Sequence, residues 1–177
     1  MLKKYIILLF ALGFIFSCSE PKKNEKEILI EKIQNLEKKC FDDASNSYNN
    51  KIALKTLIEY QGFITKFPKD SLSTHYLYTS AQLSKSINLF GEAIRKYDLF
   101  AQKYPETENA AKAKFMIGMI YENDIKDTTK AKEAYNSFIE TYPNNKLVPD
   151  AQFLISNLSL TDEELIKLLE SKSNNEK

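Results

Sequence analysis

The sequence predicts an all-α protein in which pairs of helices stack along one axis, and a repeated aromatic pattern is the main reason. Counting back from a proline, the same residue types recur three times: Tyr at −8, Phe at −5 and an aromatic residue at −1. The prolines are Pro68, Pro105 and Pro143, at intervals of 37 and 38 residues. A fixed period of this length is typical of solenoids built from stacked repeats. The chain has four glycines and no convincing alternating strand pattern, which also favours helices.

Each aromatic set predicts one helix that ends at its proline. Spacings of three and four residues place the aromatic side chains on one helical face, and a proline cannot continue the backbone hydrogen-bond ladder. Twelve residues before the proline, Ala93 and Ala131 are small enough to let a neighbouring helix approach, whereas the first set has Thr56 there. The sets are Tyr60, Phe63 and Phe67; Tyr97, Phe100 and Tyr104; and Tyr135, Phe138 and Tyr142.

A further helix is expected after each proline. An aromatic residue stands ten residues past the proline and a small residue thirteen residues past it. Each repeat unit is therefore expected to be two antiparallel helices joined by a short turn. Units must stack because neither helix can bury its apolar face alone. The aromatic residues are Tyr78, Phe115 and Phe153, and the small ones are Ala81, Gly118 and Ser156.

The same rule extends toward the N-terminus. One period before Pro68 it predicts an aromatic and a small residue near positions 41 and 44, where Phe41 and Ala44 stand. We therefore expect the first helix over about residues 26–48. The polar stretch Ser45–Asn50 is its expected exit turn.

The C-terminal end departs from the repeat register. Thr161-x-x-Glu164 before a leucine-rich run is a capping box, which predicts a helix over about residues 162–171. We interpret that helix as a terminal cap that covers the last pair. The repeat domain is then residues 27–171, and the polar residues 172–177 are expected to be a disordered tail.

These positions resemble the tetratricopeptide repeat, whose skeleton is a small residue, Tyr, Ala, an aromatic residue and Pro. Over roughly residues 27–158, the resemblance implies a tetratricopeptide-like solenoid with a right-handed superhelix, about three repeats and a C-terminal capping helix. The Phe at −5 and the Tyr-Pro ending resemble a bacterial envelope subclass. It includes the outer-membrane β-barrel assembly lipoprotein and the Tol–Pal-associated coordinator of cell division. The skeleton here is Gly118, Tyr121, Ala131, Tyr135 and Pro143.

The N-terminus predicts export and lipidation. Two lysines precede Ile6–Phe16, an apolar run of eleven residues, which suits a signal peptide and is shorter than the roughly 20 residues of a spanning helix. Its end resembles a bacterial lipobox, so residues 1–17 are the expected signal peptide and Cys18 the lipidated residue. An ordinary cleaved signal with an incidental cysteine is the alternative, although its small-residue cleavage motif is absent. Residues 18–26 then form the lipidated cysteine and a flexible tether.

Composition and sorting signals narrow the expected compartment and partners. Without residues 1–17 the chain has 23 basic and 24 acidic residues, and this near-neutral balance argues against a nucleic-acid partner. Ser19 follows the cysteine in place of Asp, which resembles an outer-membrane destination. We expect a lipid anchor in the outer membrane with the body facing the periplasm.

Residue types that carry chemistry are sparse. His75 is the single histidine, and no HExxH, P-loop, GxSxG or CxxC motif is present. We therefore expect no catalytic residues, metal, cofactor or small-molecule substrate. With Cys18 acylated, Cys40 has no partner in the chain. It is expected to be a small buried hydrophobe, with an intermolecular disulfide as the alternative.

The leading functional hypothesis is a non-catalytic, membrane-anchored scaffold for protein–protein interactions. Curved stacks of helical pairs present a concave face lined by the first helix of each pair, and a peptide or partner helix would lie there. The resemblance implies protein partners in the envelope, such as β-barrel assembly proteins. The candidate partner-binding residues are those on these helices that the core pattern leaves free: His75, Thr79, Gln82, Lys112, Lys114 and Glu122.

Two other functions stay open. Leu29, Ile33, Leu36 and Cys40 follow a 4-3-4 spacing that could form a coiled-coil seam. That seam would make the protein an oligomeric coordinator of the envelope or division machinery. A cell-wall enzyme is the third hypothesis, although the short expected loops leave little room for an active site.

Overall fold

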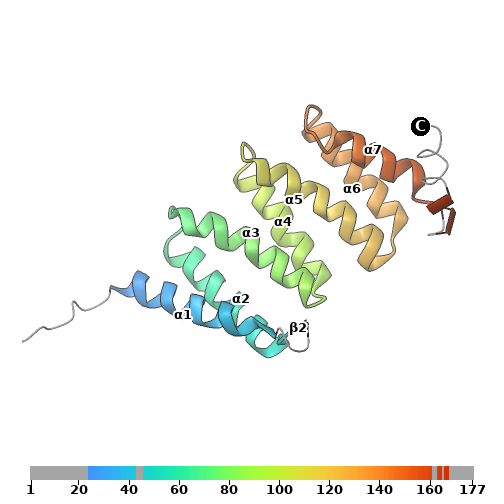
Figure 1. The fold of residues 1–177 in the computed structure, drawn as a ribbon. Helices are drawn as coiled ribbons and strands as arrows, with labels where there is room; N and C mark the ends of the chain where they lie inside the picture. The colour runs from blue at the N-terminus through green and yellow to red at the C-terminus, as the bar shows by residue number, and fades with distance from the viewer. Residues whose placement is uncertain (1–23, 43–45, 161–162, 165, 168–177) are drawn as a thin grey trace, which may run out of the picture.

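The computed structural model describes residues 24–42, 46–160, 163–164 and 166–167. Within these ranges seven α-helices follow one another, and each packs against the next along the chain (Figure 1). The expected all-α solenoid of helical pairs is confirmed. The helices are α1 (Glu25–Cys40), α2 (Asn50–Lys66), α3 (Ser71–Ser86), α4 (Phe90–Lys103), α5 (Glu108–Met119), α6 (Thr128–Thr141) and α7 (Val148–Asn157).

Helix ends follow the local sequence. Asn24 and Glu27 form a capping box at α1, in which the Glu27 amide donates to Asn24 Oδ1 at 2.9 Å. Asp70 caps α3, where the Leu72 amide donates to its Oδ1 at 2.9 Å. Three helices end two residues before a proline, with one aromatic residue between the helix and the proline. That terminal aromatic residue leaves helical geometry while its amide still bonds the carbonyl four residues back, as at Tyr104 and Phe100.

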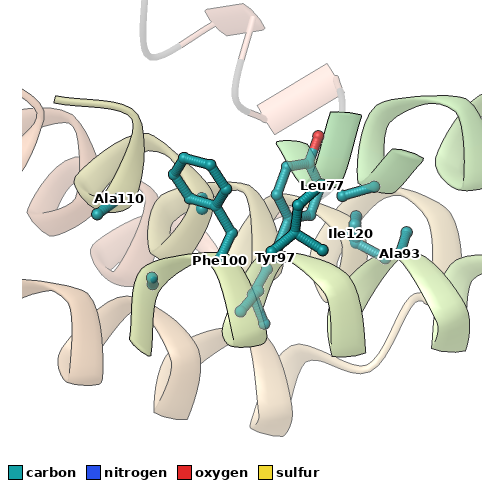
Figure 2. Packing of buried hydrophobic residues seen from close by; sticks show 10 residues of the cluster. Leu77, Ala93, Tyr97, Phe100, Ala110 and Ile120 are labelled. Atoms are coloured by element: carbon teal, nitrogen blue, oxygen red, sulfur yellow. The ribbon is translucent and has the colours of Figure 1, made fainter. Parts of the chain in front are cut away.

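The repeated aromatic residues form the core, as predicted. The tyrosines at −8 and phenylalanines at −5 are each at most 2% exposed: Tyr60, Tyr97, Tyr135, Phe63, Phe100 and Phe138. The small residues at −12 are completely buried, Thr56 included. Figure 2 shows Tyr97 and Phe100 packed among Leu77, Ala110 and Ile120, side chains contributed by neighbouring helices. The core is thus a continuous series of aromatic layers between successive helices.

The first connection differs from the prediction of a helix over residues 26–48. Helix α1 ends at Cys40, and Phe41–Asp42 (β1) pairs antiparallel with Ser47–Tyr48 (β2). The Phe41 ring packs edge-on against Tyr48, with ring centroids 5.1 Å apart, and Phe41 is 39% exposed. The turn-forming Asp, Ser and Asn residues that follow Cys40 explain why a hairpin replaces the last helical turns. Ala44, expected to be a small packing residue, lies outside the described residues.

Helix α5 continues into a short π-helix, η1 (Ile120–Ile125), which the sequence pattern did not indicate. A left-handed residue, Lys126 with φ 63°, ends it, and its amide donates to the Tyr121 carbonyl. The Asp124 carboxylate of η1 lies 3.2 Å from Lys85 Nζ of α3 and so links two successive units. The π-helical turn, which is wider than an α-helical turn, connects α5 to α6.

Several expectations fall on residues that the structure does not describe. The signal peptide, Cys18 and the tail over 172–177 lie outside the described ranges. Of the expected cap over 162–171, residues 163–164 and 166–167 are helical, and Ile166 is 54% exposed. Helix α1 begins at Glu25, so the last residues of the expected tether already belong to the helical body.

Candidate functional site

A pocket of about 330 Å³ lies between α1 and α3, with α2 as its floor. It opens to solvent, and the hairpin strand β2 contributes to its wall. Helices α1 and α3 therefore enclose a hollow that the packing of regular repeats does not by itself produce. Its lining residues are Glu37 and Cys40 of α1, Tyr48 of β2, Thr56 and Tyr60 of α2, and Thr79, Gln82, Leu83 and Ser86 of α3.

A hydrogen bond between helices holds the acidic group of this pocket. The Tyr60 hydroxyl donates to Glu37 Oε1 at 2.7 Å. Burial raises the pKa of Tyr60 well above its ordinary value, and the bond to the Glu37 carboxylate raises it further. The hydroxyl therefore keeps its proton at any physiological pH, and it fixes the Glu37 side chain on the pocket wall.

Cys40 contributes a neutral thiol to the same pocket. It is 5% exposed, and burial raises the pKa of its thiol, although a contact with Thr56 acts in the opposite direction. The thiolate is the reactive form of cysteine, so this environment does not favour nucleophilic chemistry. The expected role of a small buried hydrophobe agrees with this burial.

The structure brings together two of the three residues expected on α3. Thr79 and Gln82 both line the pocket, and neither side chain makes a hydrogen bond within the described part of the chain. His75 is exposed one helical turn earlier, with its ring centroid 5.6 Å from that of Tyr76, and it does not line the pocket.

The residues expected in the next unit lie elsewhere. Lys112 is 3.3 Å from Glu108 on its own helix. Lys114 lies 2.8 Å from Asp98 of α4, beside a separate hollow between α4, α5 and α6. Glu122 accepts a 2.5 Å hydrogen bond from the Tyr135 hydroxyl. The pocket therefore includes two of the six candidates, and the other four lie outside it.

The sequence reasoning missed Glu37, Tyr48 and Ser86. A signal for Glu37 was present, because it lies three residues before Cys40, next to the apolar seam of α1. Tyr48 could not be found in the same way, because its position depends on the hairpin.

The described residues were also compared with the requirements for a metal site and for a membrane-spanning helix. Among residues 24–42 and 46–160, no group of three or more His, Cys, Asp or Glu side chains is arranged to hold a metal ion. Over the same part of the chain, no helix combines the length and apolar character needed to cross a membrane.

Comparison with known families identifies one helical pair directly. Residues 112–145 match the family described as tetratricopeptide repeat. This range covers most of α5, all of η1 and α6, and the turn that follows. Gly118 packs directly against Tyr135 inside it, so the small-residue and aromatic positions of the repeat meet in space. A comparison with curated proteins gives no match.

Proposed function

We propose that this chain is a lipid-anchored, non-catalytic scaffold for protein–protein interactions in the bacterial cell envelope. The observation that carries the proposal is the tetratricopeptide repeat at residues 112–145, because such repeats mediate binding between proteins. The other pairs repeat its core spacing, so they extend one continuous stack. The polar pocket beside α3 gives this stack a place to hold a partner segment.

The N-terminal sequence supports the anchor. An eleven-residue apolar run that ends at Phe16 and is followed by Ser17-Cys18 resembles a lipoprotein signal. Acyl chains on Cys18 would hold the protein at a bilayer, since each buried methylene contributes about 0.8 kcal/mol and more than one chain gives stable binding. Six residues separate Cys18 from Glu25, the first residue of α1, so the body would lie close to the membrane surface.

Outer-membrane protein assembly is the process that we assign to the scaffold. Its support is the resemblance of the Phe at −5 and the Tyr-Pro ending to envelope repeat lipoproteins. The partners would then be β-barrel assembly proteins, and the helical body would face the periplasm from the outer membrane.

The coordinator alternative loses its main support in the structure. Ile33 and Cys40 of the proposed seam are buried against α2, and Leu29 packs on the same cluster. The seam is therefore used for packing within the chain. Sedimentation of the full-length protein tests this directly, because an oligomer would restore the coordinator hypothesis.

The test of the proposal is in-cell crosslinking of a tagged full-length copy, with mass spectrometry of the captured proteins and of Cys18. We expect β-barrel assembly proteins among the captured partners and a diacylglycerol-type mass increase on Cys18. A Cys18→Ala variant is the matched control, and it should leave the membrane fraction while keeping its helical content. Capture of Tol–Pal or cell-wall proteins alone would contradict the assembly role, and an unmodified Cys18 would contradict the anchor.

A further inference from the structure

We propose that the pocket between α1 and α3 binds an arginine side chain from a protein partner, with the Glu37 carboxylate as its counter-charge. This inference rests on the scaffold function, because it names the chemical class that the scaffold recognises. Its evidence is the charge, the hydrogen-bonding capacity and the size of the pocket.

Glu37 supplies an unbalanced negative charge. It is the one charged residue among the nine that line the pocket. No ion pair between the described residues includes it. Two other charged residues of α1 are paired with α2: Glu25 with Lys66 and Lys32 with Glu59. A half-buried carboxylate without a cation is incompletely stabilised, and a cationic ligand would correct this.

Lys85, the cation nearest in sequence to the pocket residues of α3, does not pair with Glu37. Lys85 precedes the lining residue Ser86, but its ammonium lies 3.2 Å from Asp124 of η1. It is therefore committed to the next unit. No described cation pairs with Glu37, so a partner's cation can take that place.

Hydrogen-bonding capacity favours arginine over lysine. Glu37 accepts one hydrogen bond from Tyr60, and a carboxylate can accept about four. Thr79 and Gln82 add oxygen acceptors on the opposite wall that have no partner within the described residues. A guanidinium has about five N–H donors in a flat fork, so it can bond to both walls at once. The half-exposed Tyr48 ring also lines the pocket, where it can stack on the guanidinium plane.

The size of the pocket fits a side chain. A volume of about 330 Å³ lies at the lower end of the range for pockets that enclose small ligands, roughly 300–1,000 Å³. A whole helix would need a longer groove with apolar anchor sites. A single long side chain, entering from an extended segment of the partner, fills the space available.

The test is a titration of the full-length protein with N-acetyl-arginine methylamide, followed by amide chemical shifts in NMR. We expect saturable shifts at Thr79, Gln82 and Ser86 with millimolar affinity. The citrulline analogue has nearly the same shape without the charge, so it should bind about tenfold more weakly or worse. Equal binding of the two probes would overturn the proposal, as would the absence of shifts at these residues.

Two variants separate the charge from the fold. Glu37→Gln keeps an oxygen that accepts the Tyr60 hydrogen bond, and it should weaken arginine binding about tenfold or more. Glu122→Gln is the matched control, because Glu122 makes the same bond to Tyr135 but does not line the pocket. It should bind arginine like the wild type. An unchanged affinity in Glu37→Gln would refute the role of the carboxylate.

The same variants distinguish this inference from the scaffold function. If in-cell crosslinking captures the same partners with Glu37→Gln as with the wild type, the scaffold stands and the arginine pocket is not its contact. If the arginine probe binds but no partner is captured, the pocket stands and the scaffold function fails.

Discussion

Replacing Gly118 by alanine tests the contact on which the third repeat unit depends. Gly118 lies in α5, and a Cβ atom there would be 2.4 Å from Cδ1 and from Cε1 of the Tyr135 ring. Carbon atoms in contact prefer about 3.5–4.0 Å, so the two helices would have to separate or the ring would have to turn. The ring has little freedom to turn, because Tyr135 is fully buried and its hydroxyl donates to Glu122 at 2.5 Å.

The expected change in the free energy of unfolding is the sum of three contributions. Overpacking of a rigid core costs about 1–3 kcal/mol. Weakening the bond to the Glu122 carboxylate adds about 1–2 kcal/mol. Alanine gains about 1 kcal/mol over glycine within a helix. We therefore expect Gly118→Ala to lower the free energy of unfolding by about 1–4 kcal/mol.

The assay is urea unfolding followed by circular dichroism at the helix band, with Gly62→Ala as the matched control. Gly62 lies within α2, and a Cβ atom there would meet no atom within 4 Å. That variant should gain about 0.5–1 kcal/mol from helix propensity alone. If the two variants shift the unfolding midpoint equally, the close approach of α5 and α6 does not limit stability and the reasoning is wrong.

Three further predictions concern the core and the titrating groups. Phe100→Ala should lower the free energy of unfolding by about 3–5 kcal/mol, because the ring is 1% exposed, and a thermal melt that overlays the wild type would refute this. In a Cys18→Ser variant, Cys40 should react with a thiol reagent far more slowly in native buffer than in urea, since the thiol is 5% exposed and burial raises its pKa; equal rates would show that the pocket is open to the reagent at its base. The Lys26 ammonium and a backbone amide hold the pKa of Asp70 below its ordinary value of 3.8. The stability that Asp70 contributes is therefore complete above that value and disappears as the pH falls through the lower folded pKa. Asp70→Asn should make the unfolding midpoint less sensitive to acid, and an unchanged pH profile would exclude this contribution.

The core could be predicted from sequence because it is periodic. Tyr97 and Phe100 pack against the same kinds of neighbour as Tyr135 and Phe138. The same residue types are therefore needed at the same positions of every unit, and they recur in the sequence. The prolines mark the helix ends for an equally local reason, since the residue before each one cannot stay helical. Such features need no knowledge of the rest of the fold.

The pocket could not be predicted because no periodic requirement creates it. Nine residues separate α1 from α2, whereas three separate α3 from α4. The longer connection folds back as a hairpin and places Tyr48 on the pocket wall. A helix over residues 26–48, which the sequence predicts, would contain no strand to place Tyr48 on the pocket wall.

This contrast suggests where to look for function in a stacked protein. Residues that recur with the period are needed for packing one unit against the next. Their recurrence therefore does not indicate which partner the protein binds. The Tyr–Glu hydrogen bond illustrates the difference, because it occurs in the first pair at Tyr60 and in the third at Tyr135. At Tyr135 the bond only joins two helices, whereas at Tyr60 it also holds Glu37 on a pocket wall. The proposed arginine pocket is therefore lined by residues that break the period around this shared contact, here Tyr48 and Gln82.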